Sequence, residues 1–292
     1  MSDQPREWTV LSMLKWATDY FEEHNVPGPR MSIEWLLAHV LEIKRLDLYL
    51  KYDRPLASHE LDALRPLVKR RARHEPLQYI TGSTDFMNAE IQVEPGVLIP
   101  RIETEHLVEI VLDDHPATEF PVRQVLDIGT GSGCIPVALK MERPGWSLTG
   151  VDISQDALRI ARLNAGHNEV EIALQRADIR QWRQEQPGSG PSFDIVISNP
   201  PYILPEERDS LEAQVRDYEP EQALFCDDLP ALYGDIIAFC EARLKPQGLL
   251  YLECHELHTG EILGLFNPDR WEARVLHDYG QKERFISARL RA

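Results

Sequence analysis

Basic residues are scarce in this chain of 292 residues. Its 31 lysines and arginines stand against 48 aspartates and glutamates, which gives a formal net charge of −17. Proteins that grip duplex nucleic acid usually carry a basic surface, because phosphate neutralisation supplies most of their affinity. The composition therefore argues against a nucleic-acid-binding protein, and we expect no direct contact with nucleic acid.

Several other features are missing. No apolar run approaches the ~20 residues that a membrane span needs, and the polar start of the chain does not resemble a signal peptide. The segment His255-Glu256-Leu257-His258 has the wrong spacing for the His-Glu-x-x-His zinc pattern. The cysteines show no Cys-x-x-Cys spacing and are expected to be reduced thiols: Cys134, Cys226, Cys240 and Cys254. We therefore expect a cytoplasmic protein with no membrane segment and no metal site.

Four residues, Asn199-Pro200-Pro201-Tyr202, directly follow the apolar run Phe193–Ser198, which is typical of a buried strand. Two prolines forbid both a helix and a central strand, so the chain must leave the sheet in a stiff extended form. In open α/β sheets ligands bind at this carboxyl edge. The Asn199 side-chain oxygen and the Pro200 carbonyl are placed to accept two N–H bonds from a planar nitrogen group, with Tyr202 packed on its face.

A second strand, Val122–Ile128, runs straight into the glycine-rich turn Gly129-Thr130-Gly131-Ser132-Gly133 and then a helical pattern. Glycines are needed where the backbone passes close to a ligand, and a helix start offers free N–H groups. The next strand ends at Asp152, about 20 residues further on, where a carboxylate can accept hydrogen bonds from a ribose.

The glycine spacing leaves a nicotinamide or flavin site open, although the third glycine comes one residue earlier than in the usual dinucleotide fingerprint. No Gly-Lys-Ser/Thr follows, so a Walker-type phosphate site is excluded. Asp127, just before the turn, would repel a pyrophosphate but suits a cationic amine or sulfonium. This favours S-adenosylmethionine as the ligand.

The stretch from Asp127 to Gly133 resembles motif I of class I S-adenosylmethionine methyltransferases, and Asn199 to Tyr202 resembles the motif of enzymes that methylate planar nitrogens. Two further stretches, Pro76–Gly82 and Val97–Glu105, narrow the resemblance to the protein-(glutamine) methyltransferases that act on peptide-chain release factors. Tyr218-Glu219-Pro220 extends it beyond the active site.

The resemblance implies a methyl transfer from S-adenosylmethionine to the side-chain amide of the glutamine in the Gly-Gly-Gln motif of class I release factors. Catalysis is assigned to Asn199, Pro200 and Tyr202, and substrate binding to these residues with Pro201. Asp178 and Ile179 would meet the adenine. The full set of expected cofactor-binding residues is Asp127, Gly129, Thr130, Gly131, Ser132, Gly133, Asp152, Asp178, Ile179 and Asn199.

The expected fold is α/β, with a mostly parallel seven-stranded sheet of the class I methyltransferase (Rossmann-like) type, because strand and helix patterns alternate. The family adds that the last strand inserts antiparallel beside the fifth. We expect a small N-terminal helical substrate-recognition domain at 1–77, a β-hairpin linker at 78–104 with a turn at Pro95-Gly96, and the methyltransferase domain at 105–292. A monomer is favoured.

Two departures from the family pattern stand out. Ile102 replaces a usual proline, and Cys254-His255-Glu256 replaces a loop that typically has a glycine soon after Glu253. Alternatives for the substrate are a ribosomal protein glutamine and, less favoured, an adenine amino group in nucleic acid. A cofactor-binding regulator without catalysis is disfavoured, because a mere binder has no use for the Asn199 motif.

A cluster of basic residues lies on one predicted helix: Arg65, Lys69, Arg70, Arg71, Arg73 and His74. A solvated helix face is the simpler interpretation of such a charge run. The alternative is a patch that meets an acidic surface on the protein substrate.

Overall fold

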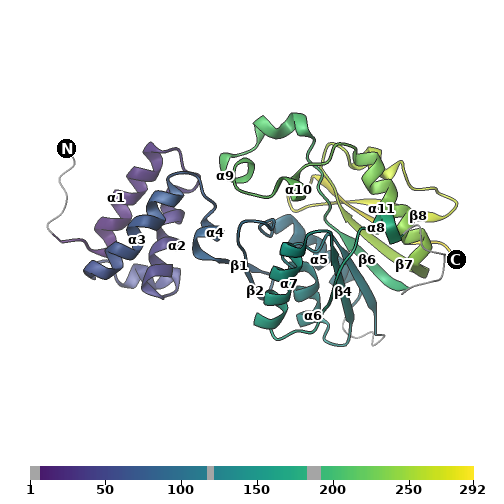
Figure 1. The fold of residues 1–292 in the computed structure, drawn as a ribbon, viewed down its shortest axis with the longest axis horizontal. Helices are drawn as coiled ribbons and strands as arrows, with labels where there is room; N and C mark the ends of the chain where they lie inside the picture. The colour runs from purple at the N-terminus through teal and green to yellow at the C-terminus, as the bar shows by residue number, and fades with distance from the viewer. Residues whose placement is uncertain (1–6, 117–121, 183–191) are drawn as a thin grey trace. The chain divides into compact units, whose positions relative to one another are not determined.

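The computed structural model describes residues 7–116, 122–182 and 192–292. The chain divides into two compact units (Figure 1). The first comprises Met1–Gly82 and Glu212–Tyr218, and the second comprises Ser83–Leu211 and Glu219–Ala292. Each unit is described by itself.

The first unit is a small helical bundle with its own apolar core. The side chain of Thr9 caps the first helix by accepting from the backbone N–H of Ser12, whose hydroxyl in turn accepts from the backbone of Thr9. Such a reciprocal cap satisfies two of the donors that a helix start leaves unpaired. Residues such as Leu14, Phe21 and Leu36 are fully buried in the core. The elements are α1 (Val10–Glu23), α2 (Pro29–Leu41), the 3-10 helix η1 (Arg45–Leu50), α3 (Ser58–Arg71), α4 (Leu77–Thr81) and α9 (Ala213–Arg216).

The basic cluster expected on α3 is partly structural. Arg71 is 3% exposed, and its guanidinium donates to the Ser32 hydroxyl, to the Pro27 carbonyl and to the Gln214 side chain. Arg70 forms an ion pair with Glu75. A buried guanidinium with several acceptors ties elements together, so Arg71 links α2, α3 and α9 within this unit. These two arginines are therefore not free to form a docking patch.

The second unit contains a seven-stranded sheet in the order β5-β4-β3-β6-β7-β9-β8. The pairs from β5 to β7 are parallel, whereas β9 lies antiparallel to both β7 and β8. The mostly parallel seven-stranded sheet and the insertion of the last strand beside the fifth are confirmed. The strands are β3 (Gln124–Ile128), β4 (Ser147–Asp152), β5 (Ala173–Arg176), β6 (Phe193–Ser198), β7 (Leu244–Glu253), β8 (Trp271–His277) and β9 (Glu283–Leu290).

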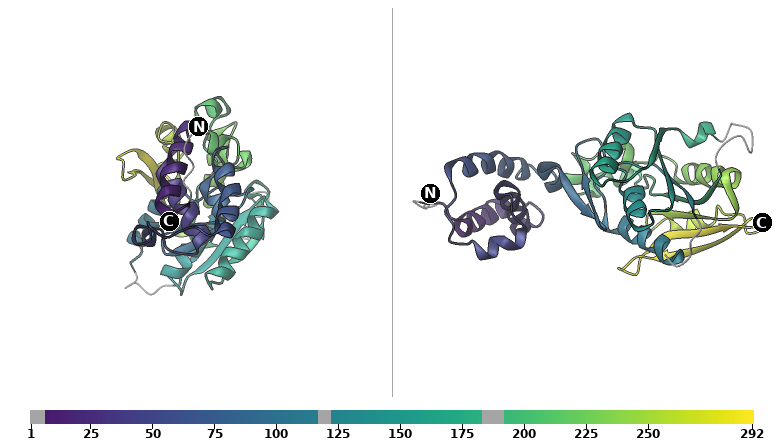
Figure 2. Two further views of the ribbon diagram at one scale, coloured as in Figure 1. Left: turned by 90° about the vertical axis from the view of Figure 1, so that its left-hand side faces the viewer. Right: turned by 90° about the horizontal axis from the view of Figure 1, so that it is seen from below.

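Helices cover both faces of this sheet (Figure 2). On one face α5, α6 and α7 pack side by side, and on the other α11 packs against α8 and α12. The strands are apolar on both faces, because the neighbours Val196 and Ile197 of β6 point to opposite faces and neither has exposed surface. A sheet covered on both sides requires this. The helices are α5 (Ile102–Asp114), α6 (Cys134–Glu142), α7 (Gln155–His167), α8 (Ile179–Trp182), α10 (Glu221–Leu224), α11 (Leu229–Arg243), α12 (Thr259–Leu263) and the 3-10 helix η2 (Pro205–Ser210).

A two-stranded hairpin, β1 (Ser83–Phe86) and β2 (Ala89–Gln92), opens the second unit. The structure differs from the expected hairpin in two details. Residues Leu77–Thr81 form the short helix α4 instead of extended chain. Pro95-Gly96 form a turn as expected, but this turn follows β2, and the two strands of the hairpin are joined at Met87-Asn88. Met87 adopts a positive φ of 52°, a conformation that is uncommon for methionine, so sequence alone gave little sign of this turn.

Candidate active site

A cavity of about 340 Å³ opens at the carboxyl ends of β3, β4 and β6. Here β4 and β5 lie on one side of β3, and β6 and β7 lie on the other. Such a switch point is where open α/β sheets bind ligands. Seven of the residues predicted for the site line this cavity: Gly129, Gly131, Asp152, Asp178, Ile179, Asn199 and Pro201.

The glycine-rich turn forms the floor of the cavity. Gly129 has a φ of 74°, and a Cβ built there would meet no atom within 4 Å, so the backbone faces open space. Gly133 has a different role at the start of α6, because a Cβ there would lie 3.0 Å from the Cβ of Ala161 on α7. The turn thus needs one glycine for access to a ligand and another for close helix packing.

Asp152 holds the turn in place. Its carboxylate accepts from the backbone N–H of Gly131 at 2.9 Å and from that of Ser154 at 2.8 Å. Burial raises the pKa of Asp152, and these backbone hydrogen bonds oppose the rise. Each carboxylate oxygen has a further lone pair, so Asp152 can still accept from a ribose that enters the cavity.

Asp178 lines the cavity, but its carboxylate is already engaged. It accepts from the backbone N–H of Arg180 at 2.9 Å and pairs with the Arg180 guanidinium at 2.7 Å. These hydrogen bonds from Arg180 lower the pKa of Asp178. Ile179 is 8% exposed and supplies an apolar part of the wall. The contact of both residues with adenine stays a prediction.

Four predicted cofactor residues are buried around the turn and do not line the cavity: Asp127, Thr130, Ser132 and Gly133. Within the described part of the chain, neither the carboxylate of Asp127 nor the hydroxyl of Thr130 has a hydrogen-bond partner. Burial raises the pKa of Asp127 to about 7. The nearby Thr130 hydroxyl, which does not reach hydrogen-bonding geometry, opposes this rise, and the charge of Asp152 adds to it. A buried carboxylate without a partner is suited to a cationic group bound close by.

The Asn199–Tyr202 motif leaves β6 as expected, and its residues point to different places. Asn199 and Pro201 line the cavity, and Pro200 is buried. Tyr202 is anchored from behind, because its hydroxyl donates to Glu253 at 3.1 Å and its ring packs on the core of the sheet. Burial and the Glu253 charge raise the pKa of Tyr202, so the phenol stays protonated. The tyrosine is therefore a fixed wall.

Sequence reasoning missed the residue that organises this motif. Glu253, at the end of β7, is fully buried and accepts from the Thr104 hydroxyl at 2.8 Å as well as from Tyr202. The Thr104 hydroxyl in turn accepts from the side-chain amide nitrogen of Asn199 at 2.9 Å. The only sign in the sequence was an acidic residue at the end of an otherwise apolar strand.

Two segments far apart in the sequence complete the walls. Gly96, Val97 and Leu98 line one side, and residues around Pro220 line another. Glu219, which is 5% exposed, joins them: its carboxylate accepts from the backbone N–H of Ile99 at 3.1 Å and pairs with the Arg101 guanidinium. The family resemblance had drawn attention to Glu219 and Arg101, but their contact follows only from the fold.

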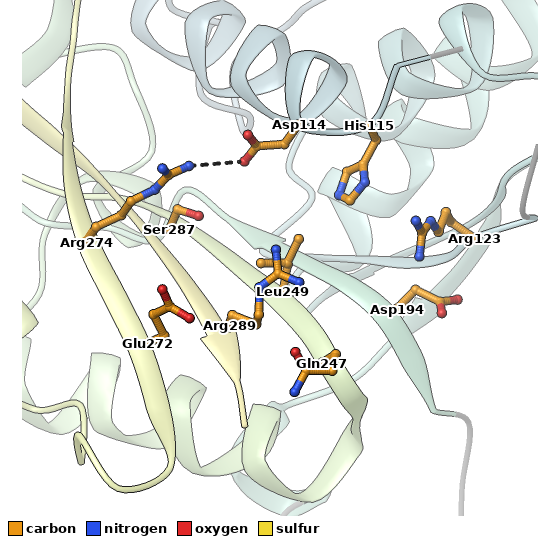
Figure 3. Close-up of a pocket in the computed structure, with 10 residues that line it drawn as sticks. All are labelled: Asp114, His115, Arg123, Asp194, Gln247, Leu249, Glu272, Arg274, Ser287 and Arg289. Carbon is orange, nitrogen blue, oxygen red and sulfur yellow. Dashed lines mark ion pairs between the residues drawn. The ribbon is translucent and has the colours of Figure 1, made fainter. Parts of the chain in front are cut away.

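A second cavity, of about 400 Å³, lies at the opposite edge of the sheet (Figure 3). It is lined near the beginnings of β3, β6 and β7 by residues such as Arg123, Asp194 and Gln247, and Arg274 pairs across it with Asp114 at 3.6 Å. It contains neither the glycine-rich turn nor the Asn199 motif, and ligands bind at the carboxyl ends of parallel strands. The smaller cavity is therefore the candidate active site.

No group of three or more His, Cys, Asp or Glu side chains within residues 7–116, 122–182 and 192–292 is arranged to hold a metal ion. In the same residues no helix combines the length and the apolar character that crossing a bilayer demands.

Comparisons with known proteins match both parts of the chain. Residues 12–82 match the family model of the PrmC N-terminal domain, and residues 104–214 match the methyltransferase small domain. A release factor glutamine methyltransferase of Chlorobaculum tepidum is 36% identical over 97% of this chain and 98% of its own. Those of Geobacter sulfurreducens and Nitratidesulfovibrio vulgaris are each 38% identical, over 91% and 96% of this chain and 91% and 95% of their own.

The chain belongs to the release factor glutamine methyltransferase family. Solved structures support the fold alone. The Thermus thermophilus 16S rRNA N2 G1207 methyltransferase, solved with AdoMet and guanosine, is 18% identical with a TM-score of 0.50 over 72% of this chain and 50% of its own. The human Mettl16 catalytic domain is 15% identical with a TM-score of 0.52 over 70% of this chain and 76% of its own.

The methyl donor of this methyltransferase is S-adenosylmethionine. The cavity fits this cofactor, because it combines an open glycine backbone at Gly129 with a carboxylate at Asp152 and apolar walls. The unpartnered carboxylate of Asp127 beside it suits the positive charges of the methionine part. Opposite charges at short range in a buried site attract strongly.

Proposed function

We propose that this chain transfers a methyl group from S-adenosylmethionine to the side-chain amide nitrogen of the glutamine in the Gly-Gly-Gln motif of class I peptide-chain release factors. One observation carries the proposal. Asn199 stands in the cavity wall with its amide nitrogen committed to Thr104. No hydrogen bond from any described residue occupies its side-chain oxygen, which can therefore accept from a substrate amide.

Methyl transfer depends mainly on the positioning of the two reactants and on electrostatic stabilisation of the transition state. A glutamine amide is a poor nucleophile, because its lone pair is delocalised into the carbonyl group. The Asn199 side-chain oxygen and the Pro200 carbonyl accept the two amide hydrogens and hold the nitrogen toward the methyl group. The same two oxygens stabilise the positive charge that develops on this nitrogen.

S-adenosylmethionine, when bound, supplies an electrophilic methyl group on a sulfonium. Gly129, Gly131 and Gly133 shape the site for its methionine part, with Asp127, Thr130 and Ser132 beneath them. Asp152 accepts from the ribose, and Asp178 and Ile179 meet the adenine. Pro201 and Tyr202 form the wall along the glutamine side chain. No general base is required, since the proton becomes acidic once the nitrogen is methylated.

We also propose that residues 1–77 recognise the release factor, that residues 78–104 link the two parts, and that residues 105–292 carry the catalytic site. The methylated factor acts in translation termination, which places the enzyme in the cytoplasm. It works as a monomer and without direct contact with nucleic acid, in line with its net charge of −17.

The decisive experiment offers labelled S-adenosylmethionine with purified release factor, ribosomal protein and DNA in parallel reactions, followed by mass spectrometry of the products. The expected result is a methyl group on the glutamine of the Gly-Gly-Gln tip, absent when that glutamine is replaced by alanine. Label on the ribosomal protein or on DNA alone would overturn the choice of substrate and leave the fold and the chemistry in place.

A further inference from the structure

Glu253 is a fully buried carboxylate that bonds directly to Tyr202 of the proposed catalytic motif and reaches Asn199 through Thr104. Its two oxygens accept from Thr104 at 2.8 Å and from Tyr202 at 3.1 Å. Within the described residues it forms no ion pair, because the neighbouring Arg284 pairs with Glu256 and Asp278. Burying such a group costs free energy, so its place behind the active site calls for a function.

When Glu253 is ionised, the hydrogen-bond directions in this network follow from counting protons. The Thr104 hydroxyl has one hydrogen, and it gives this hydrogen to Glu253. Its oxygen must then accept from the amide nitrogen of Asn199, at 2.9 Å. The Asn199 amide can satisfy Thr104 only with its nitrogen turned inward, which leaves its oxygen as the acceptor on the other side.

We propose that Glu253 is a positioning residue that acts through Thr104 to set which end of the Asn199 amide faces the substrate. An ionised Glu253 can only accept, so it holds Thr104 as a donor and presents the Asn199 oxygen to the N–H groups of a glutamine amide. A protonated Glu253 donates to Thr104 instead. Thr104 then donates to Asn199, and the amide turns its nitrogen toward the substrate, where two donors repel each other.

The surroundings of Glu253 make both charge states accessible near neutrality. Burial raises the pKa of Glu253 to about 7, against the hydrogen bonds from Thr104 and Tyr202 and the charge of Arg284, while Glu103 adds to the rise. The groups that face it come from every element packed around the end of β7: Glu103 and Thr104 on α5, Cys134 at the start of α6, Tyr202 after β6, Tyr233 on α11, Cys254 next in the chain and Arg284 on β9.

The direction of the pH dependence of turnover follows from the hydrogen-bond network. Above its pKa Glu253 is ionised and the Asn199 oxygen faces the cavity. As the pH falls through about 7, Glu253 takes up a proton and the productive orientation of Asn199 is lost. Turnover at saturating methyl donor should therefore fall toward acidic pH. Asp127, whose pKa is also about 7, should instead affect the affinity for the methyl donor.

The orientation of Asn199 can be observed without any substrate. We would label asparagine with ¹⁵N, assign the side-chain signal of Asn199 with Asn199→Ala, and follow it from about one unit below to about one unit above the pKa of Glu253. The signal should titrate in the wild type and in Thr104→Ser, which keeps the hydroxyl. It should not titrate in Thr104→Val, which removes the hydroxyl at nearly constant shape, or in Glu253→Gln, which cannot ionise.

Kinetics on the release factor complete the test, and this part rests on the proposed function. Thr104→Val should lower kcat by roughly 10- to 100-fold through misplacement of Asn199, with the affinity for S-adenosylmethionine unchanged within about twofold. Thr104→Ser should recover most of the lost kcat. A titrating Asn199 signal together with an unmethylated release factor would keep this inference and overturn the proposed function.

An Asn199 signal that titrates equally in Thr104→Val and in the wild type would overturn the inference, as would one that does not titrate in the wild type. So would a Thr104→Val enzyme with normal kcat. If Thr104→Val and Glu253→Gln lowered the melting temperature but left the titration of the Asn199 signal and kcat as in the wild type, Glu253 and Thr104 would be merely structural.

Discussion

The helical unit and the surroundings of the glycine-rich turn and the Asn199 motif bury carboxylates in opposite ways. In the helical unit, Glu34 and Glu60 are 3% and 8% exposed, and each is paired with arginine. In the unit that carries the cavity, Asp127 and Glu253 are 1% and 0% exposed, and neither forms an ion pair with a described residue. Arginine charges offset the cost of burying Glu34 and Glu60, whereas no ion pair with a described residue offsets it for Asp127 and Glu253.

The pKa values express this difference. Burial acts to raise the pKa of Glu34, but hydrogen bonds from Arg30, Arg45 and Tyr49 outweigh it and leave the pKa below its ordinary value. For Asp127 and Glu253 burial prevails, and the pKa of each rises to about 7. Buried acids with strongly raised pKa values cluster at functional sites, whereas fully paired acids are mainly structural. The contrast therefore separates carboxylates that hold the fold from carboxylates that serve the site.

The largest effect is expected at Asn199, where the hydrogen-bond network of Glu253 and Thr104 reaches the cavity. Asn199→Ala removes the acceptor for the substrate amide and should lower kcat by roughly 100- to 1,000-fold, with binding of S-adenosylmethionine nearly intact. Single-turnover methylation and calorimetric binding of the methyl donor measure the two quantities separately. Asn267→Ala, at an exposed asparagine whose side chain accepts from the backbone N–H of Asp269, is the matched control. Equal loss of binding and turnover would contradict the assigned role.

Asp127→Asn should trade cofactor affinity for stability. Folded Asp127 keeps its proton up to about pH 7, whereas the unfolded carboxyl loses it near its ordinary value of 3.8. The unfolded state therefore binds fewer protons in between, and this site's contribution to stability falls as pH rises through that window.

Asparagine does not ionise, so Asp127→Asn should exceed the wild type in unfolding free energy by on the order of 4 kcal/mol above pH 7 and by little below pH 4. Affinity for S-adenosylmethionine should fall by roughly tenfold. Denaturant melts at several pH values and calorimetry measure both. A variant that is less stable than the wild type at alkaline pH would show that Asp127 is structural after all.

Glu34→Gln should do the reverse. It removes the charge that pairs with Arg30 and Arg45, so the unfolding free energy should fall by about 1 to 3 kcal/mol. Affinity for the methyl donor should not change, since Glu34 belongs to the helical unit and does not line the cavity. Glu22→Gln, at an exposed position of α1, is the control and should leave stability unchanged. A weakened affinity for S-adenosylmethionine in Glu34→Gln would contradict the assignment of Glu34 to fold stability alone.

The smallest effect is expected at Glu219, a buried acid of the second unit that has an arginine partner in Arg101. Glu219→Gln should loosen the two walls of the cavity and weaken binding of S-adenosylmethionine by a few-fold, about 1 kcal/mol. Isothermal titration measures it, with Glu221→Gln as an exposed control. A kcat that falls while affinity stays constant would place Glu219 with the catalytic network instead.

Much of the fold could be predicted because its signals are local. The apolar runs located β3 and β6 to within two residues and the end of β4 at Asp152, and the family resemblance supplied the antiparallel last strand. The extended chain expected from residue 78 was wrong up to Thr81, where the structure has α4, and the hairpin turn at Met87 was not foreseen. Such short elements depend on packing and on an uncommon positive φ, which periodicity does not register.

For the site, the sequence singled out residues that stand next to strand ends, such as Gly129, Asp152 and Asn199, and the fold brings these into one cavity. The sequence did not indicate which other protein groups each of these side chains would bond. Asp178 is held by Arg180, and Tyr202 is anchored by a carboxylate 51 residues further along the chain. Partners at such separations leave no local pattern.

The sequence by itself determined the class of sheet, the family and the motifs that carry the chemistry, because strand periodicity, glycine-rich turns and consecutive prolines act through neighbouring residues. Only the tertiary structure decided that Thr104 and Glu253 stand behind Asn199 and that Asp127 is buried without a partner. The charge and orientation of a polar group depend on burial and on which donors surround it. Both are set when strands and helices from distant parts of the chain pack together.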